Sequence, residues 1–145
     1  MVLKGDGMRE ENVQGPVNAG CLIKKGDSVL LVKDFDSGRW GAPGGKPEAG
    51  ETPQETAERE TYEETGLKVQ AQRLLETFEG CFYLYECRVL NPEVFKESIQ
   101  VPESERHKIE EIQFIEISEI CQEIFRFPGI LDRIKALFNE AEESF

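Results

Sequence analysis

The stretch Gly45–Leu67, with the sequence GKPEAGETPQETAERETYEETGL, carries the clearest structural signal in the chain. Thr52 followed by Pro53, with Glu55 three residues after Thr52, is typical of a capped helix start. Gly66 is the residue type favoured just beyond a helix end. The sequence therefore predicts a helix that begins after Thr52 and ends before Gly66, preceded by a loop rich in glycine and proline.

This predicted helix, residues 53–65, carries five glutamates, a single arginine and few apolar side chains. A solvated acidic helix has this composition, but Glu60, Glu63 and Glu64 are spaced three and four residues apart and so project from one face. Like charges at this spacing destabilise a bare helix, and a divalent cation would relieve their repulsion. Clustered carboxylates suit Mg²⁺ or Mn²⁺, so the helix is a candidate metal site.

The loop before the helix supplies groups that complement such a metal. Gly44 and Gly45 let the backbone approach an ion or a phosphate closely and can turn a carbonyl towards it. Pro43 and Pro47 stiffen the two sides of this turn. A metal at this position would bridge the glutamates to phosphate oxygens, as Mg²⁺ usually does. The sequence therefore indicates a substrate that contains phosphate.

The same stretch closely resembles the Nudix box, the signature of the Nudix hydrolase family of MutT-like proteins. Leu67 matches the closing aliphatic position, and seven fixed positions of the signature match: Gly45, Glu51, Arg59, Glu60, Glu63, Glu64 and Gly66. Thr61 stands where the family usually has an aliphatic residue, although its methyl group can still pack. At about one in twenty per position, seven matches arise by chance about once in a billion start positions.

The resemblance implies an α/β fold of mixed type, an α/β/α sandwich around a central mixed β-sheet, with the box as loop, helix and loop. The rest of the chain agrees with this order. Periodicity predicts strands over 17–25, 28–33, 69–78, 81–90 and 109–115, and helices over 117–125 and 129–142. We expect residues 1–16 to form a tail and residues 17–145 to form a single domain.

The resemblance also implies a role for each box residue. In the family, glutamates at the positions of Glu60, Glu63 and Glu64 bind the divalent metals, Mg²⁺ or Mn²⁺. A backbone carbonyl at the position of Gly44 often helps, and an arginine at the position of Arg59 orients one of the glutamates.

The implied reaction is hydrolysis of a diphosphate linkage in a nucleoside diphosphate joined to another group. Water activated by metal attacks a phosphorus atom in line. A glutamate at the position of Glu51 supports the site. Family members differ in their general base: here we favour a box glutamate, Glu60 or Glu64, then Glu105, then Glu110.

Substrate choice has fewer markers in the sequence. Trp40 is a candidate for stacking on a base, although packing in the core is the favoured interpretation. Arg39 and Lys46 are candidate phosphate contacts, beside the backbone of Gly45. Tyr83 resembles a tyrosine of subfamilies that cleave diadenosine polyphosphates. The favoured substrate is a (deoxy)nucleoside triphosphate, the alternatives being a dinucleoside polyphosphate or a nucleotide sugar, or nucleotide sensing without hydrolysis.

The charge of the chain narrows its partners. Its 145 residues include 29 Asp+Glu against 17 Lys+Arg, a formal net charge of −12. So negative a chain repels nucleic acids and anionic membrane surfaces. No apolar run reaches the roughly 20 residues that span a bilayer, and the start lacks the apolar stretch of a signal peptide. We therefore expect a cytoplasmic protein with a small nucleotide as partner, no nucleic acid and no membrane; a homodimer is compatible with the family.

The four cysteines, Cys21, Cys81, Cys87 and Cys121, form no C-x-x-C pair and accompany a single histidine, His107. A structural zinc site is therefore not expected. In the cytosol the thiols should be reduced, and Cys21, Cys81 and Cys87 should pack as small hydrophobic side chains in strands.

Overall fold

The computed structural model describes residues 17–95 and 99–145, so the expected tail, 1–16, lies outside the described residues. The strands are β1 (Asn18–Leu22), β2 (Lys24–Lys25), β3 (Ser28–Asp34), β4 (Trp40–Gly41), β5 (Gly44–Gly45), β6 (Val69–Phe78), β7 (Phe82–Val89) and β8 (Ile109–Glu116). The helices are α1 (Pro53–Thr65) and α2 (Leu131–Glu140), and short 3-10 turns stand at Pro92–Phe95, Glu103–Glu105, Ile117–Glu119 and Pro128–Ile130.

The strands divide over two sheets. The first has the order β5-β1-β7-β6, in which β1 and β7 are parallel and the other neighbours antiparallel. In the second, β3 pairs with β2, β4 and β8, in antiparallel fashion throughout. The expected mixed sheet is therefore present as the first sheet, and a second, antiparallel sheet joins it.

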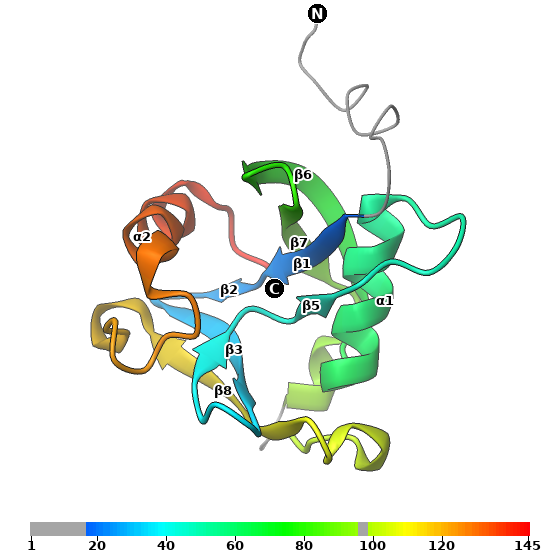
Figure 1. Ribbon diagram of the computed structural model, residues 1–145, viewed down its shortest axis with the longest axis horizontal. Coiled ribbons are helices and arrows are strands. Elements are labelled where there is room, and N and C mark those ends of the chain that lie inside the picture. The colour runs from blue at the N-terminus through cyan, green and yellow to red at the C-terminus, as the bar shows by residue number, and fades with distance from the viewer. Residues whose placement is uncertain (1–16, 96–98) are drawn as a thin grey trace, which may run out of the picture.

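The strands lie between the two helices (Figure 1). Successive side chains of a strand point to opposite faces, which divides the apolar residues over two cores. In β1, Cys21 faces the core that includes Ala57 of α1, whereas the next residue, Leu22, faces the core that includes Leu137 of α2. This arrangement is the expected α/β/α sandwich.

Helix α1 begins and ends where its sequence predicts. The Thr52 hydroxyl accepts a hydrogen bond from the Glu55 N–H, and the Glu55 carboxylate accepts one from the Thr52 N–H. At the other end Gly66 adopts φ 80° and donates its N–H to the Tyr62 carbonyl. Both ends of the helix are therefore capped, and its length is set by the local sequence.

The helix expected over 117–125 is wrong. Only a 3-10 turn at Ile117–Glu119 forms, because the following backbone pairs with β4 instead: the Trp40 N–H donates to the Ile124 carbonyl, and the Arg126 N–H to the Trp40 carbonyl. Ile120 and Phe125 still enter the core, which explains the helix-like spacing of apolar residues. The last expected helix, 129–142, is shorter than predicted, as α2 (Leu131–Glu140).

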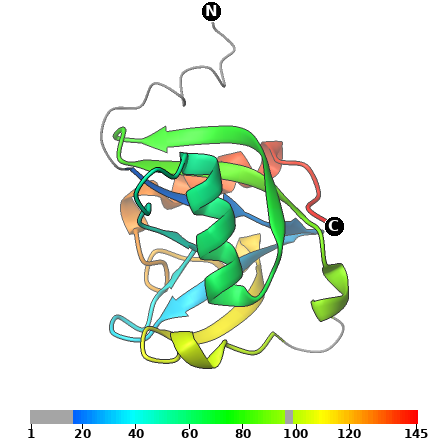
Figure 2. The same cartoon turned by 90° about the vertical axis from the view of Figure 1, so that its right-hand side faces the viewer.

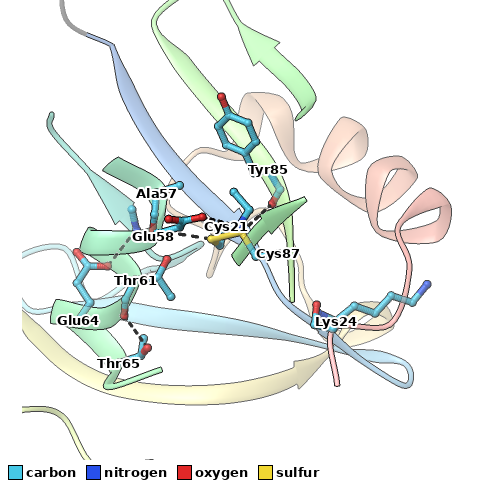
Figure 3. Close-up of a disulfide and its surroundings, with 12 residues drawn as sticks. Cys21, Lys24, Ala57, Glu58, Thr61, Glu64, Thr65, Tyr85 and Cys87 are labelled. Atoms are coloured by element: carbon cyan, nitrogen blue, oxygen red, sulfur yellow. Dashed lines mark hydrogen bonds between the residues drawn. A yellow bond between two sulfur atoms is a disulfide. The ribbon is translucent and has the colours of Figure 1, made fainter. Parts of the chain in front are cut away.

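The expectation for the cysteines is wrong in part: Cys21 and Cys87 pack in the core within strands as expected, but they are not reduced, and Cys81 is not packed. Cys21 and Cys87 form a disulfide (Figure 3), while Cys81 and Cys121 are free and exposed. Parallel pairing of β1 with β7 sets Cys21 opposite Tyr85, two residues from Cys87 on the same strand. Which two strands become neighbours is not visible in cysteine spacing. Among the described residues, no helix is long and apolar enough to cross a membrane.

Candidate metal centre

The loop before α1 packs against β1 through glycines, because a larger residue at these positions would clash with the neighbouring backbone. A Cβ atom on Gly20 would lie 2.4 Å from the Pro43 carbonyl oxygen, and one on Gly44 would lie 2.6 Å from the Ala19 carbonyl oxygen. Since real side chains do not tolerate such distances, the pairing of β1 with β5 depends on these glycines. It places the Gly44–Gly45 backbone beside the box helix.

Two carboxyl groups of α1 meet that backbone directly. The Gly44 N–H donates to Glu64 Oε1 at 3.0 Å. A Cβ atom on Gly45 would lie 2.5 Å from the Cδ atom of Glu60, so the Glu60 carboxyl fills the space that a side chain would need. The loop and the helix are therefore matched to each other at this point, and both glutamates are buried.

Arg59 organises the outer part of the box. Its Nε and Nη2 atoms donate to the Glu51 carboxylate at 2.5 and 3.1 Å, and Nη2 also donates to the Lys46 carbonyl at 2.8 Å. Its Nη1 atom reaches Glu63 at 3.1 Å and Glu60 at 3.3 Å. The hydrogen bond from Arg59 lowers the pKa of Glu51 to about 2, so this carboxylate stays charged.

Glu60 and Glu64 have the opposite electrostatic environment. Burial raises the pKa of Glu64 to about 8, opposed by the hydrogen bond from the Gly44 N–H. Burial also raises the pKa of Glu60, opposed by the charge of Arg59. In both carboxyl groups burial therefore outweighs the nearby positive charge and hydrogen bonds, and a bound cation would favour their ionised forms.

The 3-10 turn at Glu103–Glu105 brings a further carboxyl group to this place. Figure 2 shows the segment that includes the turn below the carboxyl end of α1. Glu105 is buried, and its Oε1 atom lies 3.1 Å from Lys108 Nζ. The charge of Lys108 lowers the pKa of both Glu60 and Glu64, while that of Glu105 raises the pKa of Glu64. Helix and turn therefore form one electrostatic cluster.

The donors present fit a hard divalent cation, because they are carboxylate oxygens beside a glycine backbone that leaves room for close approach. Within residues 17–95 and 99–145, however, no three acidic, histidine or cysteine side chains form a ready ligand set. Their oxygens have internal partners instead: the Gly44 N–H donates to Glu64, Arg59 donates to Glu60 and Glu63, and Lys108 forms an ion pair with Glu105. Metal binding therefore requires these donors to be exchanged.

The remaining candidate residues lie further from the carboxyl cluster or in solvent. Arg39 and Lys46 are exposed. Trp40 is 9% exposed and packs in the core on the α2 side, which agrees with the packing interpretation. Tyr83 is half-buried in β7, opposite Ala19.

Lys108 contributes to the cluster but is not among the candidate residues from the sequence. Its position three residues after Glu105 is the sole sequence feature that indicates the ion pair. Glu110 was the last choice as general base, and it is exposed and pairs with Lys33 at 3.6 Å. Glu105 is therefore a better candidate for the general base than Glu110, because Glu105 lies in the cluster.

Known proteins resemble the chain both in sequence and in structure. The family profile described as the NUDIX domain matches residues 15–137. A MutT-like protein of Streptomyces ambofaciens is 34% identical over 62 residues, which are 43% of this chain and 40% of that protein. Human diphosphoinositol polyphosphate phosphohydrolase 3-alpha is 45% identical over 65 residues, 42% of this chain and 40% of that protein. The chain thus spans well under half the length of these curated relatives.

A solved structure of a NUDIX hydrolase from Nitrosomonas europaea has a TM-score of 0.69 with the chain at 20% identity, covering 91% of this chain and 94% of that one. A likeness at this identity shows the fold. The family profile extends over most of the chain, from before β1 into α2, and the signature residues occupy the loop and helix that the fold brings together. The chain belongs to the Nudix family.

Proposed function

We propose that this protein is a pyrophosphohydrolase that cleaves a diphosphate linkage in a nucleoside diphosphate joined to another moiety. A small nucleotide, such as a (deoxy)nucleoside triphosphate, is the preferred substrate. The observation that carries the proposal is the burial of Glu60 and Glu64 against the Gly44–Gly45 backbone, which raises the pKa of both carboxyl groups. Relatives named for such reactions, including an RNA pyrophosphohydrolase of Psychromonas ingrahamii, support the reaction class.

The proposed cofactor is Mg²⁺ or Mn²⁺, held by Glu60, Glu63 and Glu64 with help from the Gly44 carbonyl. When bound, it supplies a Lewis acid that activates water and neutralises charge on the diphosphate. The protein's own groups hold the site: Arg59 fixes Glu63 and Glu60 in place, and the Gly44 N–H positions Glu64.

The proton of the attacking water needs an acceptor. A box glutamate, Glu60 or Glu64, stays our first choice because both adjoin the loop that would receive the phosphates. Glu105 comes second, since it is buried in the same cluster and is held by Lys108 alone. Glu51 is not a base in this scheme, because its hydrogen bonds to Arg59 keep it charged and engaged.

The substrate contacts proposed are the Gly45 backbone, Arg39, Lys46 and, for a base, Trp40 or Tyr83. The exposure of Arg39 and Lys46 suits contact with phosphates. The position of Trp40 in the core makes it the weakest of these contacts. Dinucleoside polyphosphates and nucleotide sugars are the alternative substrates, and a sensor that does not hydrolyse is the less favoured reading because all the box carboxylates are present.

The proposal treats residues 17–145 as one domain, placed in the cytoplasm, acting on a small nucleotide rather than on nucleic acid, and compatible with a homodimer. The test is a panel of nucleoside triphosphates, dinucleoside polyphosphates and nucleotide sugars, assayed with Mg²⁺ or Mn²⁺ for phosphate or pyrophosphate. Release that depends on the metal and is lost in Glu64→Gln supports the proposal. Tight nucleotide binding without turnover under every metal would establish the sensor instead.

A further inference from the structure

Three buried carboxyl groups share one lysine. Glu60, Glu64 and Glu105 are 8%, 7% and 9% exposed, respectively, and belong to two separate elements, α1 and the 3-10 turn after β7. Lys108 Nζ lies 3.1 Å from Glu105 Oε1, and its positive charge acts on both Glu60 and Glu64. Buried carboxylates are unfavourable without a nearby cation, so the identity of this cation matters for the metal-free protein.

Arg59 cannot serve all three groups, because its guanidinium is already shared. It donates to Glu51 with two nitrogens, to the Lys46 carbonyl, and to Glu63 and Glu60. Neither Glu64 nor Glu105 receives a hydrogen bond from it among the described residues. Lys108 is therefore the cation that compensates Glu64 and Glu105, whereas Glu60 has Arg59 first and Lys108 second.

The backbone holds Lys108 towards the cluster. The Glu105 N–H donates to the Pro102 carbonyl at 2.9 Å, and the Lys108 N–H donates to the Glu105 carbonyl at 3.0 Å. The Lys108 carbonyl accepts from the Phe35 N–H at 2.9 Å, which ties the turn to the end of β3. Arg106 and Lys108 are both exposed residues of this segment, but Arg106 has no ion-pair partner among the described residues. Lys108 and Arg106 are only two residues apart, but only Lys108 forms an ion pair with the cluster.

We propose that Lys108 is the internal counter-cation of the Glu60, Glu64 and Glu105 cluster, and that a divalent metal must displace its ammonium group when it binds. A lysine and a divalent cation repel each other strongly at the separations that a shared set of carboxylates imposes. Displacement frees the Glu105 carboxylate from its ion pair and leaves a mobile ammonium group at the edge of the site, where substrate phosphates would arrive. The inference rests on the proposed function only in that the cluster binds a metal.

The test compares Lys108→Met with Arg106→Met. Both variants remove one positive charge from the same turn, so they change the net charge of the chain equally. Mn²⁺ affinity is measured by isothermal titration calorimetry without nucleotide. Lys108→Met should bind Mn²⁺ about fivefold more tightly than wild type, the value of one partly exposed ion pair, and Arg106→Met should match wild type. Equal affinities in the two variants, or weaker binding by Lys108→Met, would overturn the proposal.

A second measurement follows Lys108 directly, in wild type and in a variant that keeps the positive charge. In protein with ¹⁵N-labelled lysine, the Lys108 Nζ signal, assigned with Lys108→Arg, should change on addition of Mg²⁺ together with the Gly44 and Gly45 amides. Lys108→Arg, which keeps the charge, should keep the wild-type metal affinity. If the glycine amides respond to Mg²⁺ while the Lys108 signal stays unchanged, the ammonium is not displaced and the proposal fails.

The two proposals fail in different ways. Metal binding that tightens in Lys108→Met, with no hydrolysis of any nucleotide by wild type, would refute the proposed function and leave the role of Lys108 standing. Hydrolysis by wild type, with unchanged metal affinity in Lys108→Met, would refute the role of Lys108 alone.

Discussion

Two acidic stretches of this chain have similar charge but different structures. Residues 51–67 hold six glutamates and one arginine, a net −5, and residues 97–123 hold eight glutamates against Arg106 and Lys108, a net −6. In the first stretch the carboxyl groups are buried or bound to Arg59 and to backbone N–H groups. In the second, Glu105 is the one buried glutamate among the described residues. A high density of acidic residues therefore does not by itself indicate a functional site. Burial of carboxyl groups beside fixed hydrogen-bond donors is the better indicator.

Substitution of one glutamate in each stretch gives the largest expected difference. Glu64→Gln removes a charged oxygen that the Gly44 N–H positions, and nucleotide hydrolysis should fall by about 100- to 1000-fold. Glu110→Gln removes an exposed carboxylate that pairs with Lys33, and activity should stay within about twofold of wild type. Initial rates under saturating Mg²⁺ measure both.

Circular dichroism and thermal melting must show that both variants keep the wild-type fold. An equal loss of activity in the two variants would show that the second stretch takes part in chemistry as much as the first. An active Glu64→Gln enzyme would show that the metal lies elsewhere.

Stability gives the next difference between the stretches. Arg59→Met removes the ion pair and both Arg59 hydrogen bonds of the Glu51 carboxylate, which is 15% exposed, and should lower the free energy of unfolding by about 2 kcal/mol. Lys33→Met removes the ion-pair partner of the exposed Glu110 carboxylate and should cost at most about 0.5 kcal/mol. Urea unfolding at pH 7 measures both values. Equal losses would mean that the Arg59 network is no stronger than a surface ion pair.

The difference between the stretches also shows what sequence can predict. The first is local: the cap at Thr52, the stop at Gly66 and the i, i+3 and i, i+4 spacing of Glu60, Glu63 and Glu64 lie within one helix. Its start, its end and the face that carries these glutamates can therefore be predicted from neighbouring residues, and the structure places the helix as expected.

The second stretch depends on contacts between distant residues. Lys108 reaches Glu105 in its own turn, but its effect on Glu60 and Glu64 depends on how that turn packs below α1. The Cys21–Cys87 disulfide likewise depends on the parallel pairing of β1 with β7, and the irregular segment after Ile117 on pairing with Trp40. Sequence periodicity holds no information on such pairings, so these features could not be predicted.

The pH dependence of the metal-free protein should follow the box glutamates rather than the exposed ones. Glu64 has a folded pKa of about 8 against 4.5 when unfolded, so its contribution to stability is fully present below pH 4.5 and is lost as pH rises to 8. Glu51 has a folded pKa of about 2, so its contribution to stability is fully present above pH 4.5 and is lost as the pH falls to about 2. Between pH 5 and 8 the free energy of unfolding in EDTA should therefore fall.

Glu64→Gln should flatten this decline, and Mg²⁺ should reverse it in wild type, whereas Glu110→Gln should leave it unchanged. Urea titrations at pH 5, 6, 7 and 8 measure the slope. A decline of the same size in Glu64→Gln would assign the pH dependence to other groups.

The smallest expected effect concerns Thr61, the one box position that departs from the family pattern. Its side chain is buried in the protein interior. Thr61, labelled in Figure 3, is fully buried, and its hydroxyl has no hydrogen-bond partner among the described residues. Valine has the same shape without the polar atom, so Thr61→Val should raise the free energy of unfolding by about 1 kcal/mol and leave hydrolysis unchanged. Thr65→Val is the matched control, because the Thr65 hydroxyl donates to the Thr61 carbonyl at 2.7 Å and accepts from the Leu67 N–H at 3.1 Å. It should lower stability by about 1 kcal/mol, so a loss in both variants would show that the Thr61 hydroxyl has a partner after all, such as a buried water.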